Sequence, residues 1–224
     1  MRRFAAALLA AALVAGGCQS PALAESAVAT PAAQVPANEG KGLKTAVFAG
    51  GCFWGIEGVF SHVRGVTSAV SGFHGGTAAN ANYGQVSSGD TGHAEAVKVT
   101  YDPAVVRYDQ LLRVFFAVGT DPTQLNRQGP DTGTQYRSAL VPLSAEQRRV
   151  AAAYLAQLGA SGLWKRPIVT KVEGYKGFYA AEAYHQDFMA ENPTHPYIQR
   201  WDAPKVSALA KMFPTLYRKG FVTG

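Results

Sequence analysis

Strand and helix patterns follow one another in a fixed order between residues 45 and 142, and this order restricts the possible folds more than any other feature. Four runs are apolar and β-prone, as buried strands are, and they lie at residues 45–49, 66–73, 94–101 and 138–142. Apolar residues recur at helical spacing over residues 53–63 and 108–118. The order β-α-β-β-α-β predicts an α+β fold, a two-layer sandwich with a ferredoxin-like core.

The remaining part of the chain predicts a C-terminal extension of this core. Residues 144–158 are expected to form a helix, because Ser144 is a good N-cap residue. A strand is predicted over residues 168–173 and a further helix over residues 180–190. The segment from Trp201 onward carries no clear pattern, so its structure is left open.

Residues 1–24 have the features of an export signal. Two arginines precede an apolar run over residues 4–15, which is too short to span a bilayer. The small residues at 22–24 suit cleavage that releases a soluble protein, whereas residues 15–18 resemble a lipoprotein signal in which Cys18 becomes a lipidated N-terminus. We therefore expect an exported protein, periplasmic or secreted, with a membrane anchor through Cys18 as the alternative.

A linker and one folded domain are expected after this signal. Residues 25–42 are rich in Ala and Pro and contain no stretch that could pack, which predicts a flexible linker ahead of a domain over residues 43–224. The chain is 47% hydrophobic and 11% aromatic, which excludes general disorder, and its two cysteines are too few for a disulfide scaffold. Its net charge of +6 comes from scattered basic residues, so no nucleic-acid partner is expected.

Cys52 is the first candidate for chemistry. It stands in the segment Gly-Gly-Cys-Phe-Trp-Gly at residues 50–55, after a predicted strand and at the start of a predicted helix. Free backbone N–H groups and the positive end of the helix dipole favour a thiolate at that position. Gly51 allows a substrate to approach the backbone closely. The alternative is a buried structural thiol, which is the usual state of a free cysteine.

Glu95 is the second candidate. Side chains alternate along a strand, so Glu95 shares a face with Val97, Val99 and Tyr101, and that face is expected to point into the core. Burial raises the pKa of a carboxyl and would keep Glu95 protonated near neutral pH, fit to act as a general acid. The alternative places Glu95 just beyond the core, at a solvated strand edge.

Two polar, glycine-containing segments are expected to form functional loops. Residues 75–92 include Tyr83, and residues 124–138 include Asp131 and Tyr136. Long segments of this kind inside a compact domain are often functional. Asp131 could instead organise a turn, and Tyr83 could lie at the surface. The five histidines show no metal-ligand spacing with one another or with the cysteine, so no metal site is expected.

Together these segments closely resemble peptide methionine sulfoxide reductase of the A class. The matching segments are GGCFWG at 50–55, GHAEAV at 92–97, DPTQLNRQG at 121–129, DTGTQYRSA at 131–139 and AYHQDF at 183–188. The resemblance implies that Cys52 is the nucleophile and Glu95 the proton donor of a catalytic domain. It assigns substrate binding to Gly51, Phe53 and Trp54. It assigns the oxygen-binding side of the site to Tyr83, Asp131 and Tyr136.

The activity implied by this resemblance is thiol-dependent reduction of the S epimer of methionine sulfoxide, free or in proteins. Cys52 would take the oxygen and become a sulfenic acid, with no metal or organic cofactor. Many relatives carry resolving cysteines near the C-terminus, whereas residues 193–224 contain none, and Ile198 stands where some relatives have cysteine. The expected partner is therefore an external thiol reductant, such as a thioredoxin-like protein, and the protein itself is expected to be a monomer.

Two other functions stay open at this point. A cysteine hydrolase or acyltransferase would need His185 or another imidazole within reach of Cys52. A surface lipoprotein could bind oxidised methionine peptides without turning them over, although Cys52 and Glu95 argue against this. An activity assay with dithiothreitol separates a reductase from a binding protein.

Overall fold

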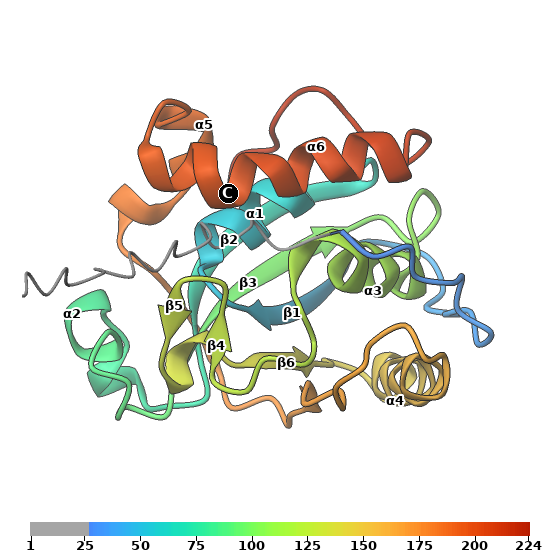
Figure 1. The fold of residues 1–224 in the computed structure, drawn as a ribbon, viewed down its shortest axis with the longest axis horizontal. Helices are drawn as coiled ribbons and strands as arrows, with labels where there is room; N and C mark the ends of the chain where they lie inside the picture. Colours follow the sequence, from blue (N-terminus) through green and yellow to red (C-terminus); the bar gives the residue numbers. More distant parts are fainter. Residues whose placement is uncertain (1–26) are drawn as a thin grey trace, which may run out of the picture.

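The computed structural model describes residues 27–224, so the export signal predicted for residues 1–24, with Cys18, lies outside the described residues. The centre of the molecule is a six-stranded sheet with the strand order β7-β6-β1-β3-β2-β8 (Figure 1). The strands are β1 (Lys44–Gly50), β2 (Val66–His74), β3 (Ala94–Tyr101), β6 (Ser138–Val141), β7 (Lys171–Val172) and β8 (Phe178–Ala180). Neighbouring strands are antiparallel, except that β7 runs parallel to β6.

The four inner strands confirm the predicted ferredoxin-like core. Strands β6, β1, β3 and β2 are adjacent in that order, with α1 (Phe53–Ser61) between β1 and β2 and α3 (Tyr108–Val114) between β3 and β6. Phe48 of β1 packs against both helical segments, with ring centroids 4.6 Å from Phe60 of α1 and 5.4 Å from Phe115, which opens the π-helical continuation of α3 (Phe115–Gly119). Both helical segments therefore share one hydrophobic core with the sheet, as the α+β sandwich requires.

The residue alternation along β3 shows which side of the sheet faces this core. Val97, Val99 and Tyr101 belong to the main hydrophobic core with α1 and α3, whereas Ala96 belongs to a smaller cluster on the opposite face. Glu95 has the same parity as the core residues, and it is only 3% exposed. The prediction that Glu95 enters the core is confirmed, and the solvated alternative is wrong.

The two polar segments contain short regular elements. The first holds a 3-10 turn (Ala78–Asn80) and α2 (Tyr83–Val86). The second forms a hairpin of β4 (Arg127–Gln128) and β5 (Asp131–Thr132), and a 3-10 turn (Thr134–Tyr136) follows. The three site candidates of these segments thus belong to defined elements, which hold their positions.

Helix α4 (Ala145–Ala160) forms where the sequence predicts it. The Ser144 hydroxyl accepts a 3.1 Å hydrogen bond from the Gln147 N–H, which is the expected N-cap. Tyr154 of this helix packs into the main core. The strand predicted over residues 168–173 is shorter in the structure, because only the two residues of β7 pair with β6.

The segment ahead of β1 differs from its prediction. Residues 27–42, which fall within the predicted flexible linker, pack on the domain and bind it through backbone groups. The Val28 N–H donates to the Ala117 carbonyl over 2.8 Å, and the Tyr154 hydroxyl donates to the Pro31 carbonyl over 2.8 Å. Prolines restrict this chain before it docks, which lowers the entropic cost of ordering it. The expectation that no part of the linker packs is therefore wrong for these residues.

The continuous helix predicted over residues 180–190 is also wrong. The structure has a 3-10 turn (Ala183–His185) and a separate short helix, α5 (Phe188–Glu191). Between them, the Gln186 side-chain amide bonds the backbone N–H and C=O of Ser71 in β2, over 2.9 and 3.0 Å. Asp187 then turns the chain with a φ of 53°. These long-range bonds to the sheet replace the hydrogen bonds of a continuous helix.

The last part of the chain forms a π-helical turn (Ile198–Asp202) and α6 (Ala203–Met212). Figure 1 shows α6 running along α1, so that α1 lies between the sheet and the C-terminal elements. Within residues 27–224, no helix is both long enough and apolar enough to cross a lipid bilayer.

Two glycines of α1 permit this close packing. A Cβ at Gly55 would overlap the Asp202 carboxylate, and a Cβ at Gly58 would overlap the Met189 side chain. Helix α1 is enclosed as a result, and Trp54 is its only residue that is not buried. The start of α1 therefore presents one partly exposed aromatic ring next to Cys52.

Candidate active site

The turn between β1 and α1 presents Cys52. Gly51 has a φ of 97°, a backbone conformation that residues with a side chain rarely adopt, and a Cβ there would overlap the Gln128 side chain of β4. Gly51 thus lets the β4–β5 hairpin close against the cysteine. Cys52 is the N-cap residue of α1, and it is a free, partly exposed thiol.

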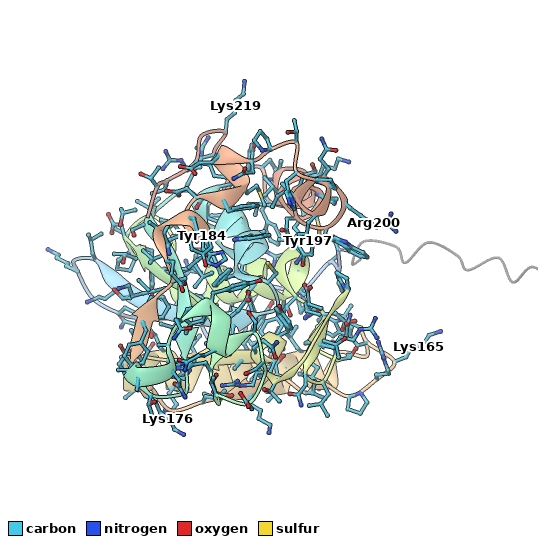
Figure 2. The ribbon with its side chains drawn as sticks, turned by 90° about the vertical axis from the view of Figure 1, so that its left-hand side faces the viewer. Lys165, Lys176, Tyr184, Tyr197, Arg200 and Lys219 are labelled. Atoms are coloured by element: carbon cyan, nitrogen blue, oxygen red, sulfur yellow. The ribbon has the colours of Figure 1, made fainter. Side chains whose placement is uncertain are left out.

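Cys52 borders a small pocket between the β4–β5 hairpin and the C-terminal elements. Its wall includes Asp131 from the hairpin and Tyr197, Trp201 and Lys205 from the C-terminal part of the chain. The Tyr197 hydroxyl donates a hydrogen bond to the Asp131 carboxylate. Figure 2 shows Tyr197 on the same side of the molecule as Tyr184. The hydrogen bond joins the two walls of the pocket across a long stretch of sequence.

The environment of the Cys52 thiol favours its protonated form. Burial is the largest cause and raises its pKa well above the ordinary value. Negative charge on Glu95, Asp202 and Asp131 raises the pKa further, while a hydrogen bond from the Trp54 N–H lowers it by less. The helix N-terminus therefore acts in the direction that the sequence predicts, and burial of Cys52 acts against it.

Glu95 lies beside the cysteine as a buried acid. Its Oε2 accepts a 2.9 Å hydrogen bond from the backbone N–H of Phe53. Burial raises the pKa of Glu95 to about 8, more than the Phe53 hydrogen bond lowers it, and the charges of Asp131 and Asp202 raise it further. Glu95 is therefore mostly protonated at neutral pH, as the sequence predicts, and it holds a proton available for transfer.

Two tyrosines share the space around this acid. Burial raises the pKa of Tyr136, and the charges of Glu95, Asp131, Tyr83 and Cys52 raise it further, so these groups are near enough to Tyr136 to influence its pKa. Burial followed by the charge of Glu95 also raises the pKa of Tyr83. Both phenols stay protonated and can donate hydrogen bonds. The five residues that the sequence assigns to catalysis are thus near enough to influence one another electrostatically.

The two aromatic residues after Cys52 have different environments. The Phe53 ring is only 1% exposed and packs on Phe73, with centroids 5.8 Å apart. Its direct contribution to the site is the backbone N–H that binds Glu95. The Trp54 ring is partly exposed and stacks on Phe188, with centroids 3.7 Å apart and planes 8° from parallel. Of the two rings assigned to substrate binding, Trp54 is the accessible one.

The imidazole of His185 is hydrogen-bonded to Trp54 rather than to Cys52 in the structure. Its Nδ1 accepts a 3.2 Å hydrogen bond from Nε1 of Trp54, so this nitrogen cannot also serve as a base for the thiol. Within the part of the chain that the structure describes, no group of three His, Cys, Asp or Glu side chains is arranged to hold a metal ion.

The sequence profile of the family described as "Peptide methionine sulfoxide reductase" matches residues 44–216, which include every residue of this pocket. The chain belongs to this family. It is 55% identical over 176 residues to peptide methionine sulfoxide reductase MsrA 2 of Mesorhizobium japonicum, covering 79% of this chain and 90% of that protein. It is 49% identical over 174 residues to the reductase of Deinococcus radiodurans, covering 78% of this chain and 84% of that protein.

Solved structures agree with the family assignment. Methionine sulfoxide reductase A of Corynebacterium diphtheriae superimposes with a TM-score of 0.59 and 33% identity, covering 77% of this chain and 89% of that chain. The reduced form of Mxr1 from Saccharomyces cerevisiae gives a TM-score of 0.58 and 32% identity, covering 72% of this chain and 92% of that chain. The protein is thus an oxidoreductase that acts on methionine sulfoxide.

Three residues near this reductase site, Tyr197, Asp202 and Lys205, could not be predicted from the sequence. Tyr197 binds Asp131, and Lys205 lies with its Nζ 3.8 Å from Oδ1 of Asp202. Asp202 is fully buried and Lys205 is 8% exposed. The sequence from Trp201 onward shows no clear periodicity, and a buried Asp is unusual. Only the packing of α6 on α1 therefore reveals the pair of Asp202 and Lys205. Tyr197 offers no signal besides its position within the family match.

Ile198, where the resemblance places a cysteine in some relatives, is a core residue in this reductase. Ile198 is 1% exposed and opens the π-helical turn that leads into α6. The sequence contains only two cysteines, Cys18 and Cys52, and Cys18 lies outside the described residues. The structured C-terminus therefore supplies no second thiol to the pocket.

Proposed function

We propose that this reductase acts on the S epimer of methionine sulfoxide, free or in proteins, with Cys52 as nucleophile and Glu95 as proton donor. The observation that supports this best is the pairing of the two groups. Glu95 is buried, has a pKa of about 8, and is bound to the N–H of the residue that follows Cys52. A protonated acid next to a thiol is the pair that sulfoxide reduction needs.

In the first step, the sulfur of Cys52 attacks the sulfoxide sulfur while the sulfoxide oxygen is protonated. The protonated Glu95 and the hydroxyls of Tyr83 and Tyr136 neutralise the charge that develops on this oxygen. The oxygen, with the proton from Glu95, passes to Cys52, which becomes a sulfenic acid. The proton of the Cys52 thiol is left on the Glu95 carboxylate, and the methionine thioether is released. The thiol is oxidised by two electrons and the sulfoxide is reduced by two, so the step balances without a cofactor.

In the second step, an external thiol attacks the Cys52 sulfenic acid, releases water and forms a mixed disulfide. A second thiol then frees Cys52 and leaves with the first one as a disulfide. This route follows from the absence of a second cysteine after Cys52 and from the burial of Ile198. A thioredoxin-like protein is the proposed reductant, and the protein is proposed to act as a monomer.

The proposal includes export through residues 1–24. Their charged start and short apolar run support it. The mature protein then begins at Glu25 and is periplasmic or secreted, or it carries lipid on Cys18. Intact-mass analysis of the exported protein distinguishes these forms, and a protein recovered with Met1 still in place contradicts export.

A single-turnover experiment tests the chemistry. The protein is mixed with excess S-epimer methionine sulfoxide without any added thiol. We expect one equivalent of methionine per protein and one oxygen atom added to the peptide that contains Cys52, by mass spectrometry. The Cys52→Ser variant serves as the control and is expected to release no methionine. Methionine release by this variant, or none by the wild type, contradicts the proposal.

A further inference from the structure

We propose that Glu182 is a positioning residue that holds Tyr83 where its hydroxyl meets the sulfoxide oxygen. This inference rests on the proposed function, because it takes Tyr83 as one of the hydrogen-bond donors to that oxygen. It concerns a carboxyl that the mechanism does not use and that is not among the five residues assigned to catalysis.

A hydrogen bond between distant parts of the chain carries the inference. Oε1 of Glu182 accepts the backbone N–H of Tyr83 over 3.0 Å, although the two residues are 99 positions apart. Tyr83 is the first residue of α2, so its N–H is one of those that the helix itself leaves without an acceptor. Within residues 27–224, the other oxygen of this carboxyl is buried without a hydrogen-bond partner, so the bond to Tyr83 is the one that the carboxyl makes.

Glu182 supplies the anchor at the N-terminal end of α2. This helix has only four residues, and Figure 1 shows it at the left-hand edge of the molecule. Its other end is held separately, because Val86 enters the main core and the Ser87 carbonyl accepts a 3.1 Å hydrogen bond from Nε2 of Gln135. Both of these contacts come after Tyr83 in the chain. The bond to Glu182 therefore fixes the end of α2 that carries the phenol.

Glu182 is itself fixed to the central sheet. Ala181, before it, and Gln186, after it, both donate to the carbonyl of Ser71 in β2, over 2.9 and 3.0 Å. The Gln186 amide also donates to the Ala181 carbonyl over 2.9 Å, which closes the turn between them. The Glu182 carboxyl therefore extends from a rigid turn, as a group that positions another residue has to.

The same turn also contacts the Tyr83 ring. The centroid of the His185 ring lies 4.4 Å from that of Tyr83, and His185 is only 2% exposed. Glu182 thus holds the backbone of Tyr83, while His185 packs against its ring. Burial, followed by the charge of Glu95, raises the pKa of Tyr83, so the phenol lies near the buried acid with which it acts.

Three variants of Glu182 separate this role from packing. Glu182→Leu fills similar space but removes the acceptor, and Glu182→Ala removes the acceptor without adding an apolar group. Glu182→Gln keeps an amide oxygen that can accept the Tyr83 N–H. The matched control is Glu146→Ala. Oε1 of Glu146 also accepts a backbone N–H, that of Asn38, over 2.7 Å, but Glu146 belongs to α4, which does not line the pocket beside the thiol.

The first readout is single-turnover kinetics with the free S sulfoxide, in which maximal rate and apparent substrate affinity are measured separately. Glu182→Leu and Glu182→Ala are expected to lower the maximal rate by roughly threefold to tenfold, the range for one weakened hydrogen bond. Apparent affinity is expected to change less, because Tyr83 acts on charge that develops in the transition state. Glu182→Gln is expected to keep most of the rate, and Glu146→Ala all of it.

The second readout is a double-mutant cycle with Tyr83→Phe, which identifies the residue through which Glu182 acts. If Glu182 places the Tyr83 hydroxyl, its replacement has little further effect once that hydroxyl is gone. The variant that combines Glu182→Leu with Tyr83→Phe is therefore expected to react within about twofold of the rate of Tyr83→Phe.

Two results overturn the inference. One is a wild-type maximal rate in both Glu182→Leu and Glu182→Ala. The other is a double variant in which the two separate decreases in rate multiply, because Glu182 would then act independently of Tyr83. A wild-type protein that reduces no sulfoxide, or a wild-type rate in Tyr83→Phe, contradicts the proposed function instead, so the two failures are distinguishable.

Discussion

The carboxyl of Glu95 and the backbone N–H of Phe53 are joined by a 2.9 Å hydrogen bond, between the middle strand β3 and the first residue of α1. This bond ties a buried acid to the residue that follows Cys52 in the chain. The Phe53 N–H donates to Oε2 of the carboxyl, so this bond does not use the proton that Glu95 carries. The acid is thus oriented by the same helix terminus that presents the thiol, which gives the two groups a fixed mutual position.

Replacement of Glu95 by Gln tests the acid directly. The amide keeps the shape and can accept the Phe53 N–H, but it cannot supply a proton. We expect the sulfoxide step in Glu95→Gln to slow by about 100-fold or more, with apparent substrate affinity largely kept. Rapid-quench measurement of methionine release checks this. The matched control is Glu57→Gln on α1, since Glu57 is also buried with a pKa of about 8 but does not border the pocket. Equal slowing in both variants would remove Glu95 as the proton donor.

The same buried Glu57 makes stability depend on pH. Its pKa is raised from 4.5 to about 8 in the folded protein, mainly by burial. The folded state therefore holds a proton that the unfolded state loses, and stability falls as pH rises from about 4.5 to about 8. Glu57→Gln removes this loss. The free energy of unfolding of the variant, relative to that of the wild type, should therefore increase across that range by the order of a few kcal/mol.

Urea denaturation at pH 5, 6, 7 and 8 measures this difference. Glu146→Gln is the matched control, because the pKa of Glu146 is lowered by its hydrogen bond to Arg149, and its contribution to stability is lost only below about pH 4.5. A constant difference between Glu57→Gln and the wild type at all four pH values would show that Glu57 titrates normally.

Addition of one methyl group at Gly55 tests the packing of the C-terminal elements on α1. A Cβ there would overlap the buried Asp202 carboxylate, so Gly55→Ala is expected to destabilise the protein by about 1–3 kcal/mol. Gly159→Ala in α4 is the control, since nothing lies within 4 Å of a Cβ at that exposed position. The control is expected to gain about 0.5–1 kcal/mol from helix propensity. Thermal unfolding of both variants decides, and a stabilised Gly55→Ala would contradict the described contact.

Removal of residues 27–41 tests whether the segment before β1 is part of the domain. A protein that begins at Gly42 is expected to be less stable than one that begins at Ala27 by about 2–5 kcal/mol, because it loses several hydrogen bonds and their packing. Denaturant unfolding checks this value. Tyr154→Phe should cost about 1 kcal/mol in the longer form only, since its hydroxyl binds Pro31. Equal cost in both forms would place this segment outside the folded unit.

The core fold could be predicted because it depends on local patterns. Alternation along β3 places Glu95 with Val97 and Val99, whatever surrounds the strand. Helical spacing and the Ser144 cap similarly predict α1, α3 and α4. The continuous helix predicted over residues 180–190 failed for the opposite reason. Its break depends on a bond between Gln186 and Ser71, which are far apart in the sequence.

The sequence by itself determined the family, the order of the core elements, the nucleophile Cys52 and the parity that buries Glu95, because motifs and periodicity are properties of neighbouring residues. Only the tertiary structure showed that burial raises the pKa of Cys52, and which contacts Asp202, Tyr197 and His185 make. These depend on burial and on charges brought together from distant segments, since the dielectric environment of a group is set by everything packed around it.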